Sequence, residues 1–144
     1  MNPEYIILHH SLTEDGQTVN WQAICKYHIE TNGWNDVGYH YGLERIGDKY
    51  EILKGRMDNE TGAHCLGFND KSIGICLIGN YDITPPSMEQ YALLAKLVHS
   101  LMGIYGIKND KIIGHFESYG LLDKPIAKTC PGSRFSMNEF RRMV

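Results

Sequence analysis

Histidines, a cysteine and a lysine stand where apolar segments run out into loops, and together they could bind a metal ion. His9 and His10 close one apolar segment, and His115 closes another. Cys130 follows His115 by fifteen residues, and Lys128 lies two residues before the cysteine. Catalytic zinc takes three protein ligands and leaves a fourth position for water, so two imidazoles and one thiolate would suffice. The wide spacing leaves this interpretation open, because structural zinc sites show tighter pairs of ligands.

The same side chains also have a simpler structural interpretation. An imidazole at the end of a strand often hydrogen-bonds a neighbouring carbonyl group, and an isolated lysine is usually a solvated charge. Consecutive side chains of a strand point to opposite faces. We therefore expect only one of His9 and His10 to face a given site, and the same holds for Tyr39 and His40.

The remaining histidines and the cysteines allow several interpretations. His28 and His99 fall within predicted helices, where partial exposure or an ordinary hydrogen bond would explain them. His64 lies in a long loop over 54–71, and loop packing and substrate contact are equally open for it. No two of the four cysteines have C-x-x-C spacing, so we expect free thiols, with Cys76 inside the most apolar strand.

Apolar runs and helical periodicity predict the elements that position these residues. A turn with a helix cap is expected at 15–18. The predicted strands cover 5–8, 37–45, 49–53, 72–79 and 111–115. The predicted helices cover 19–31, 88–105 and 136–140.

This order of elements predicts an α/β fold. Strands that alternate with helices favour one sheet with helices on its faces. The hairpin expected around Gly47 makes the sheet mixed rather than purely parallel. We expect a single mixed sheet of about five to six strands flanked by helices. No repeat, low-complexity segment or linker divides the chain, so residues 1–144 are expected to form a single domain.

Composition narrows the possible partners. Fourteen basic and seventeen acidic side chains leave a formal charge of −3, which argues against a nucleic-acid-binding protein. No apolar run is long enough to span a membrane, and the first ten residues lack the basic and apolar regions of a signal peptide. We expect a protein made in the cytoplasm, monomeric by default, with no membrane or nucleic-acid partner.

Four sequence blocks resemble the zinc-dependent N-acetylmuramoyl-L-alanine amidases, the family of bacteriophage lysozymes and peptidoglycan recognition proteins. The blocks are IILHHS at 6–11, GWNDVGYHY at 33–41, GAHCLGFN at 62–69 continuing into SIGICLIG at 72–79, and GHFE at 114–117 with KTCPG at 128–132. Each block alone is weak, whereas all four in family order span nearly the whole chain. The resemblance implies that residues 1–144 form a single catalytic amidase domain.

The resemblance also implies roles for individual residues. One Zn²⁺ per chain is expected, held by ligands that correspond to His9, His115 and Cys130. The family's catalytic tyrosine and lysine correspond to Tyr39 and Lys128. Lys128 would stabilise the developing oxyanion, and Tyr39 would orient the water or share that task. His64 and Asn69 match the loop that lines the family's substrate groove and are expected to contact the substrate.

The implied reaction is hydrolysis of the amide bond between N-acetylmuramic acid and L-alanine of the stem peptide, so the partner would be peptidoglycan or a muropeptide. The short chain and the cysteine ligand favour a phage-type endolysin that acts on the cell wall after release. Other roles are a cytoplasmic amidase that recycles imported wall fragments, a secreted effector and a non-catalytic peptidoglycan-binding module. A metal-free hydrolase would instead use Cys130 as nucleophile and His115 as base.

Overall fold

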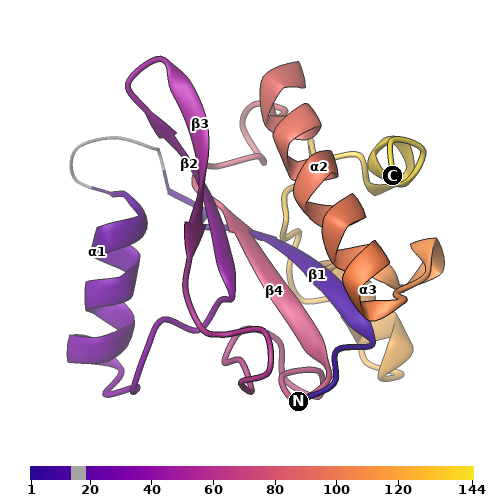
Figure 1. The fold of residues 1–144 in the computed structure, drawn as a ribbon, viewed down its shortest axis with the longest axis horizontal. Coiled ribbons are helices and arrows are strands. Elements are labelled where there is room, and N and C mark those ends of the chain that lie inside the picture. Colours follow the sequence, from indigo (N-terminus) through magenta and orange to yellow (C-terminus); the bar gives the residue numbers. More distant parts are fainter. Residues whose placement is uncertain (14–18) are drawn as a thin grey trace.

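The computed structural model describes residues 1–13 and 19–144, and this part of the chain forms one five-stranded sheet (Figure 1). The strands, in the order β3-β2-β4-β1-β5 across the sheet, are β1 Tyr5–His10, β2 Tyr41–Ile46, β3 Lys49–Lys54, β4 Ser72–Leu77 and β5 Ile112–Gly114. β1 is parallel to both of its neighbours, β4 and β5, whereas β2 and β3 form an antiparallel hairpin. The predicted single mixed sheet is therefore confirmed.

Helices cover both faces of the sheet (Figure 1). α1, Trp21–Lys26, continues as a wider π-type turn over Tyr27–Thr31 and lies on one face. α2, Met88–Tyr105, and α4, Met137–Arg141, pack on the opposite face. α3, His115–Leu121, directly follows β5, and a short 3₁₀ turn at Asn109–Lys111 precedes that strand. Within the described ranges, no helix is long and apolar enough to cross a membrane.

Alternation along β1 decides which face carries His9. Ile6 and Leu8 belong to the main core, which buries side chains of α2 and α4 such as Leu94, Val98, Leu101 and Phe140. Ile7 belongs to a separate cluster on the other face, with Phe68 and Ile113. Because side chains alternate across a strand, His9 shares the face of Ile7 and points away from α2.

Local sequence sets the ends of α2. The Ser87 hydroxyl accepts the Gln90 N–H at 3.2 Å, and the Gln90 side chain accepts the Ser87 N–H at 3.0 Å. This reciprocal capping box satisfies two N–H groups that the helix leaves without partners. Gly106 ends the helix with φ of 67°, a left-handed conformation that favours glycine. The helix predicted over 88–105 is confirmed.

The strand predicted over 37–45 is shorter than expected. β2 begins only at Tyr41. The His40 N–H still donates to the Gly74 carbonyl of β4 at 2.9 Å, whereas the carbonyl groups of Gly38 and His40 bond to loop residues. The Gly38 carbonyl accepts the Ala63 N–H, and the His40 carbonyl accepts the Gly55 N–H, both at 2.9 Å. Tyr39 and His40 therefore lie before the strand, in the segment that leads into it.

The helix α3 was not predicted from the sequence, and His115 begins this helix instead of closing a strand. The Glu117 carboxylate accepts the Gly114 N–H at 2.8 Å, which caps the first turn. At the other end of the chain, α1 begins at Trp21 behind the cap residue Asn20, whose side chain accepts the Ala23 N–H. The turn and cap predicted at 15–18 lie outside the described residues.

Candidate active site

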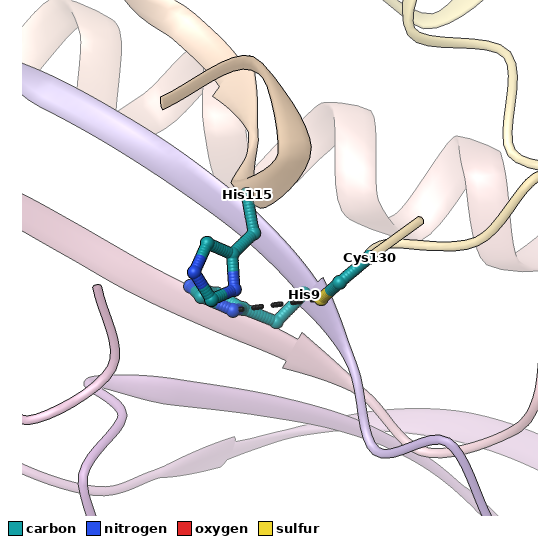
Figure 2. A group of neighbouring side chains, drawn as sticks. All are labelled: His9, His115 and Cys130. Carbon is teal, nitrogen blue, oxygen red and sulfur yellow. Dashed lines mark hydrogen bonds between the residues drawn. The ribbon is translucent and has the colours of Figure 1, made fainter. Parts of the chain in front are cut away.

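His9, His115 and Cys130 converge at one end of the sheet, although they are distant in the sequence (Figure 2). His9 lies near the end of β1, and His115 directly follows β5. These strands are parallel neighbours in which Leu8 pairs with Gly114, so the next residue of each strand reaches the same edge. A ligand atom from each of the three side chains lies within 4.8 Å of the other two.

The spacing of these atoms fits a tetrahedral metal ion. In a zinc site with ordinary bond lengths, neighbouring nitrogen and sulfur ligand atoms lie ~3.3–3.6 Å apart. Sγ of Cys130 and Nδ1 of His9 are 3.7 Å apart. The three ligand atoms already lie within 4.8 Å of one another, so small side-chain adjustments would bring them to that geometry. Two nitrogens and one sulfur also suit the borderline-soft character of zinc.

Burial sets the protonation states of the three residues. His9 is only 1% exposed, and desolvation lowers its pKa well below the usual value. Desolvation, assisted by the charge of Lys128, lowers the pKa of His115 to about 4. Burial raises the pKa of the Cys130 thiol to about 12. At neutral pH both imidazoles therefore keep a free lone pair, whereas the thiol requires a bound cation to ionise.

The raised pKa argues against Cys130 as a metal-free nucleophile. The thiolate is the reactive form of cysteine, and a pKa of about 12 leaves almost none of it at neutral pH. A metal ligand has no such difficulty, because the metal itself stabilises the deprotonated sulfur. Burial of the thiol therefore favours Cys130 as a ligand over the alternative in which it attacks the substrate with His115 as base.

Hydrogen bonds on both sides of Cys130 hold the loop that carries it. The Cys130 carbonyl accepts the N–H of Phe116, at the start of α3, at 2.8 Å. The Asp82 carboxylate accepts the Thr129 hydroxyl at 3.0 Å and the Ser133 N–H at 2.7 Å. The Ser133 N–H is the main reason that the pKa of Asp82 is lowered. Asp82 thus joins the residues just before and just after the thiol to the loop that follows β4.

The three candidate ligands line a cavity of about 720 Å³. This volume lies within the ~300–1,000 Å³ range of small-molecule sites. Of the other residues singled out from the sequence, Tyr39, Lys128 and His64 also line the cavity, whereas Asn69 does not. Further lining residues include Ser11, His28, Trp34, Asp82 and Ile126.

Tyr39 and Lys128 offer hydrogen-bond donors of different kinds to this cavity. Desolvation raises the pKa of Tyr39 well above the usual value, so its hydroxyl remains protonated. Its ring centroid lies 5.2 Å from that of His9. Lys128 is exposed at the cavity, and its positive charge helps to lower the pKa of His9 and His115 and opposes the rise in the pKa of Cys130.

The adjacent pairs of candidates divide as the alternation argument predicts, with one exception. Tyr39 lines the cavity, whereas His40 is fully buried: its Nδ1 accepts the Gly74 N–H at 3.0 Å and its Nε2 lies 2.9 Å from the Glu60 carbonyl. His9 belongs to the ligand set, whereas Nδ1 of His10 accepts the Tyr81 N–H at 3.2 Å. His10 nevertheless also lines the cavity, and its backbone N–H donates to the Cys130 sulfur at 3.4 Å.

His64 contacts the candidate ligand His9 directly. Nδ1 of His64 lies 3.0 Å from Nε2 of His9, and the two rings are perpendicular with centroids 5.0 Å apart. Desolvation lowers the pKa of His64 to about 3, so the ring is neutral at neutral pH. Its position on the cavity wall is compatible with the expected substrate contact, but the closest partner in the structure is His9.

Asn69 has a different place from the one expected. Its Oδ1 accepts the backbone N–H groups of both His64 and Cys65 at 2.8 Å. The side chain therefore organises the loop from within and is not among the residues that line the cavity. Both hydrogen bonds turn the carboxamide oxygen toward the loop backbone and give Asn69 a role in holding the loop, and the expected substrate contact stays a prediction.

Sequence reasoning missed His28 and Trp34 as parts of the site. Nδ1 of His28 accepts the Gly38 N–H at 3.0 Å, and its ring lies 4.7 Å from Trp34 and 5.8 Å from Tyr39 between centroids. Both residues line the cavity. Helical spacing alone could not identify the face of His28, because the π-type turn shifts the direction of its side chain.

Comparisons with known proteins agree with this geometry. Residues 1–133 match the family described as N-acetylmuramoyl-L-alanine amidase. The endolysin of Enterobacteria phage T3 is 36% identical over 110 residues, which cover 71% of this chain and 68% of the endolysin. Peptidoglycan-recognition protein SC2 of Drosophila melanogaster is 30% identical over 143 residues, which cover 95% of this chain and 72% of that protein.

A solved structure shares the fold over almost the whole length. The N-acetylmuramoyl-L-alanine amidase LysC from Clostridium intestinale URNW has a TM-score of 0.80 and 28% sequence identity, and the match covers 98% of this chain and 84% of that one. The family match spans both histidines and the cysteine of the candidate metal centre. The chain therefore belongs to the N-acetylmuramoyl-L-alanine amidase family.

Proposed function

We propose that this chain is a zinc-dependent amidase that hydrolyses the bond between N-acetylmuramic acid and L-alanine of peptidoglycan, with residues 1–144 as one catalytic domain. The observation that carries the proposal is the convergence of two neutral imidazoles and a thiol within 4.8 Å, in a chain that belongs to the amidase family. Tyr39 and Lys128 line the same cavity and complete the set of groups that amide hydrolysis requires.

The proposed metal is one Zn²⁺ per chain, held by His9, His115 and Cys130. Zinc in such a site supplies a Lewis acid that acidifies water and polarises a carbonyl oxygen. The protein's own contribution is a rigid ligand set. Two ligands stand at the ends of neighbouring strands, and the third is fixed through the Cys130 carbonyl and the Asp82 hydrogen bonds.

Lys128 and Tyr39 would stabilise the negative charge that develops on the amide oxygen. The Lys128 ammonium brings a full positive charge to the cavity, and one well-placed donor to an oxyanion is typically worth about 2.7–4 kcal/mol. The Tyr39 hydroxyl keeps its proton because burial raises its pKa, so it can donate but is a poor base. We assign it to orienting water or donating to the oxyanion.

A phage-type endolysin is the biological role that we propose. The T3 endolysin matches this chain over 71% of its length at 36% identity. The presence of Cys130, Tyr39 and Lys128 at one cavity supports catalysis over recognition alone. A recycling amidase would use the same site on soluble fragments, so the two roles differ in preference for polymeric or soluble substrate.

The proposal is tested by replacing the sulfur ligand. Cys130→Ser should lose at least about a hundredfold in hydrolysis of a soluble muropeptide, because a neutral hydroxyl replaces the thiolate. Its co-sedimentation with purified peptidoglycan should remain. Cys25→Ser, at a cysteine outside the cavity lining, is the matched control and should keep full activity. Full activity in Cys130→Ser would contradict the ligand assignment.

A further inference from the structure

The two nitrogens of the His9 ring face different partners. Nδ1 faces the Cys130 sulfur at 3.7 Å, and Nε2 faces Nδ1 of His64 at 3.0 Å. A neutral imidazole has one nitrogen that carries a proton and one with a free lone pair. His9 can therefore ligate through Nδ1, on the Cys130 side, only when its proton resides on Nε2, on the His64 side.

A chain of hydrogen bonds behind His64 determines which of these forms exists. The Ser72 hydroxyl donates to the Phe68 carbonyl at 2.7 Å. A hydroxyl has a single proton, so toward Nε2 of His64, at 3.4 Å, the Ser72 oxygen acts as acceptor. This arrangement requires a proton on Nε2 of His64 and leaves its Nδ1 as an acceptor. That acceptor faces Nε2 of His9, which must then be protonated.

The residues packed around the His64 ring leave it little freedom to rotate. A Cβ atom at Gly62 or Gly74 would lie 2.5 or 2.6 Å from Cδ2 of the His64 ring, closer than side chains tolerate. The backbone N–H of His64 is held by Asn69 at 2.8 Å. The ring thus occupies a slot between two glycines, and its Nδ1 is aimed at His9.

We propose that His64 is a positioning residue for the metal ligand His9. Through the relay that begins at the Phe68 carbonyl, His64 fixes the protonated nitrogen and the orientation of the His9 ring, so that Nδ1 presents its lone pair beside Cys130. Partners of this kind keep ligating imidazoles oriented, and their loss typically lowers metal affinity about 10–100-fold. The inference rests on the proposed function, since it presumes a metal in this site.

The tautomers can be observed directly in the wild-type protein. Two-dimensional NMR that correlates ring carbon-bound protons with ¹⁵N-labelled imidazole nitrogens distinguishes the two neutral forms. In the metal-free protein at neutral pH, we expect the proton of His64 on Nε2 and that of His9 on Nε2 as well. A proton on Nδ1 of His64 would overturn the inference, whatever the enzyme activity.

Zinc affinity, measured by competition with a chromophoric chelator, tests the consequence. His64→Phe should bind Zn²⁺ about 10–100-fold more weakly than the wild type, and His64→Asn, which offers an acceptor oxygen near the place of Nδ1, should recover part of the loss. The exposed His99→Phe is the control and should match the wild type. Wild-type affinity in a folded His64→Phe would overturn the inference, whereas a wild-type protein that takes up no Zn²⁺ would contradict the proposed function instead.

Discussion

The candidate ligands owe their protonation states to burial rather than to ion pairing. Desolvation is the largest cause of the lowered pKa values of His9, His64 and His115 and of the raised pKa of Cys130. Without a cation these four groups are neutral at neutral pH, and Lys128 supplies the nearby positive charge. A divalent ion would thus bind two imidazoles that are already neutral and one thiol that must release its proton.

This burial predicts a pH dependence of stability for the zinc-free protein. The folded pKa values of about 3 for His64 and about 4 for His115 lie below the unfolded value of ~6.5. As pH falls below ~6.5, these histidines bind protons in the unfolded chain but stay neutral in the folded chain. The free energy of unfolding therefore decreases. For each fully buried histidine such as His9, the free energy of unfolding decreases by up to about 1.4 kcal/mol per pH unit.

Thermal unfolding of the zinc-free protein at pH 8.0, 6.5, 5.5 and 4.5 checks this dependence. We expect a nearly constant melting temperature between the first two conditions and a progressive decrease below them. A melting temperature that stays level down to pH 4.5 would show that these imidazoles accept protons in the folded state, contrary to the burial argument.

Lys128 is expected to matter for turnover and hardly at all for folding. Because the side chain is exposed, Lys128→Ala should leave the melting temperature within about 1 °C of the wild type. Loss of an oxyanion partner should lower kcat about 10²–10³-fold. Lys124→Ala, an exposed lysine of the same loop that does not line the cavity, is the matched control. Equal kcat in the two variants would remove Lys128 from the mechanism.

At the level of elements, the register between β1 and β5 brings the two histidines together. The Leu8–Gly114 pair places His9 and His115 one residue further along parallel neighbours. The cysteine lies on a loop outside the sheet, although its sulfur accepts the His10 N–H of β1 at 3.4 Å. It depends on the Phe116 N–H and on Asp82, which ties the loop after β4 to the residues around the thiol.

Asp82 is therefore expected to help hold the Cys130 sulfur in position for metal binding. Asp82→Ala should weaken Zn²⁺ binding about tenfold, since both hydrogen bonds to the Cys130 loop are lost. Thr129→Val removes only one of them and should have a smaller effect. Asp48→Ala, in the exposed β2–β3 turn, serves as the control. If calorimetric titration gives the same affinity for Asp82→Ala and the control, the loop is held by other contacts.

Sequence alone predicted the elements whose signals are local. The apolar run of β4 and the capping box of α2 depend on residues within a few positions of one another. α3 has a local cap in Glu117, but its start also depends on distant support, the Cys130 carbonyl that accepts the Phe116 N–H, and the sequence did not predict this helix. The same limit applies to the site: the family blocks predicted the candidate ligands His9, His115 and Cys130, which the fold brings together, but the direction of the His28 side chain depends on its contacts with Gly38 and Trp34.

At the scale of the whole molecule, the sheet separates a packed face from a functional face. α2 and α4 bury the main core on one side (Figure 1). By alternation along β1, His9 points to the other side, which it shares with Ile7. The cavity of about 720 Å³ gathers side chains from the first strand, the segment before β2, the loop before β4 and the loop of Cys130. Each of these segments carries one of the sequence blocks that resemble the amidase family.

The proposed activity is metal-dependent cleavage at one defined bond. The most direct measurement is digestion of purified peptidoglycan by the recombinant chain, with products identified by mass spectrometry, before and after treatment with a chelator. We predict free stem peptides that begin with L-alanine, lost on chelation and restored by added Zn²⁺. Undiminished cleavage in the presence of the chelator, or no stem peptide from folded and zinc-loaded protein, would contradict the proposed zinc-dependent amidase activity.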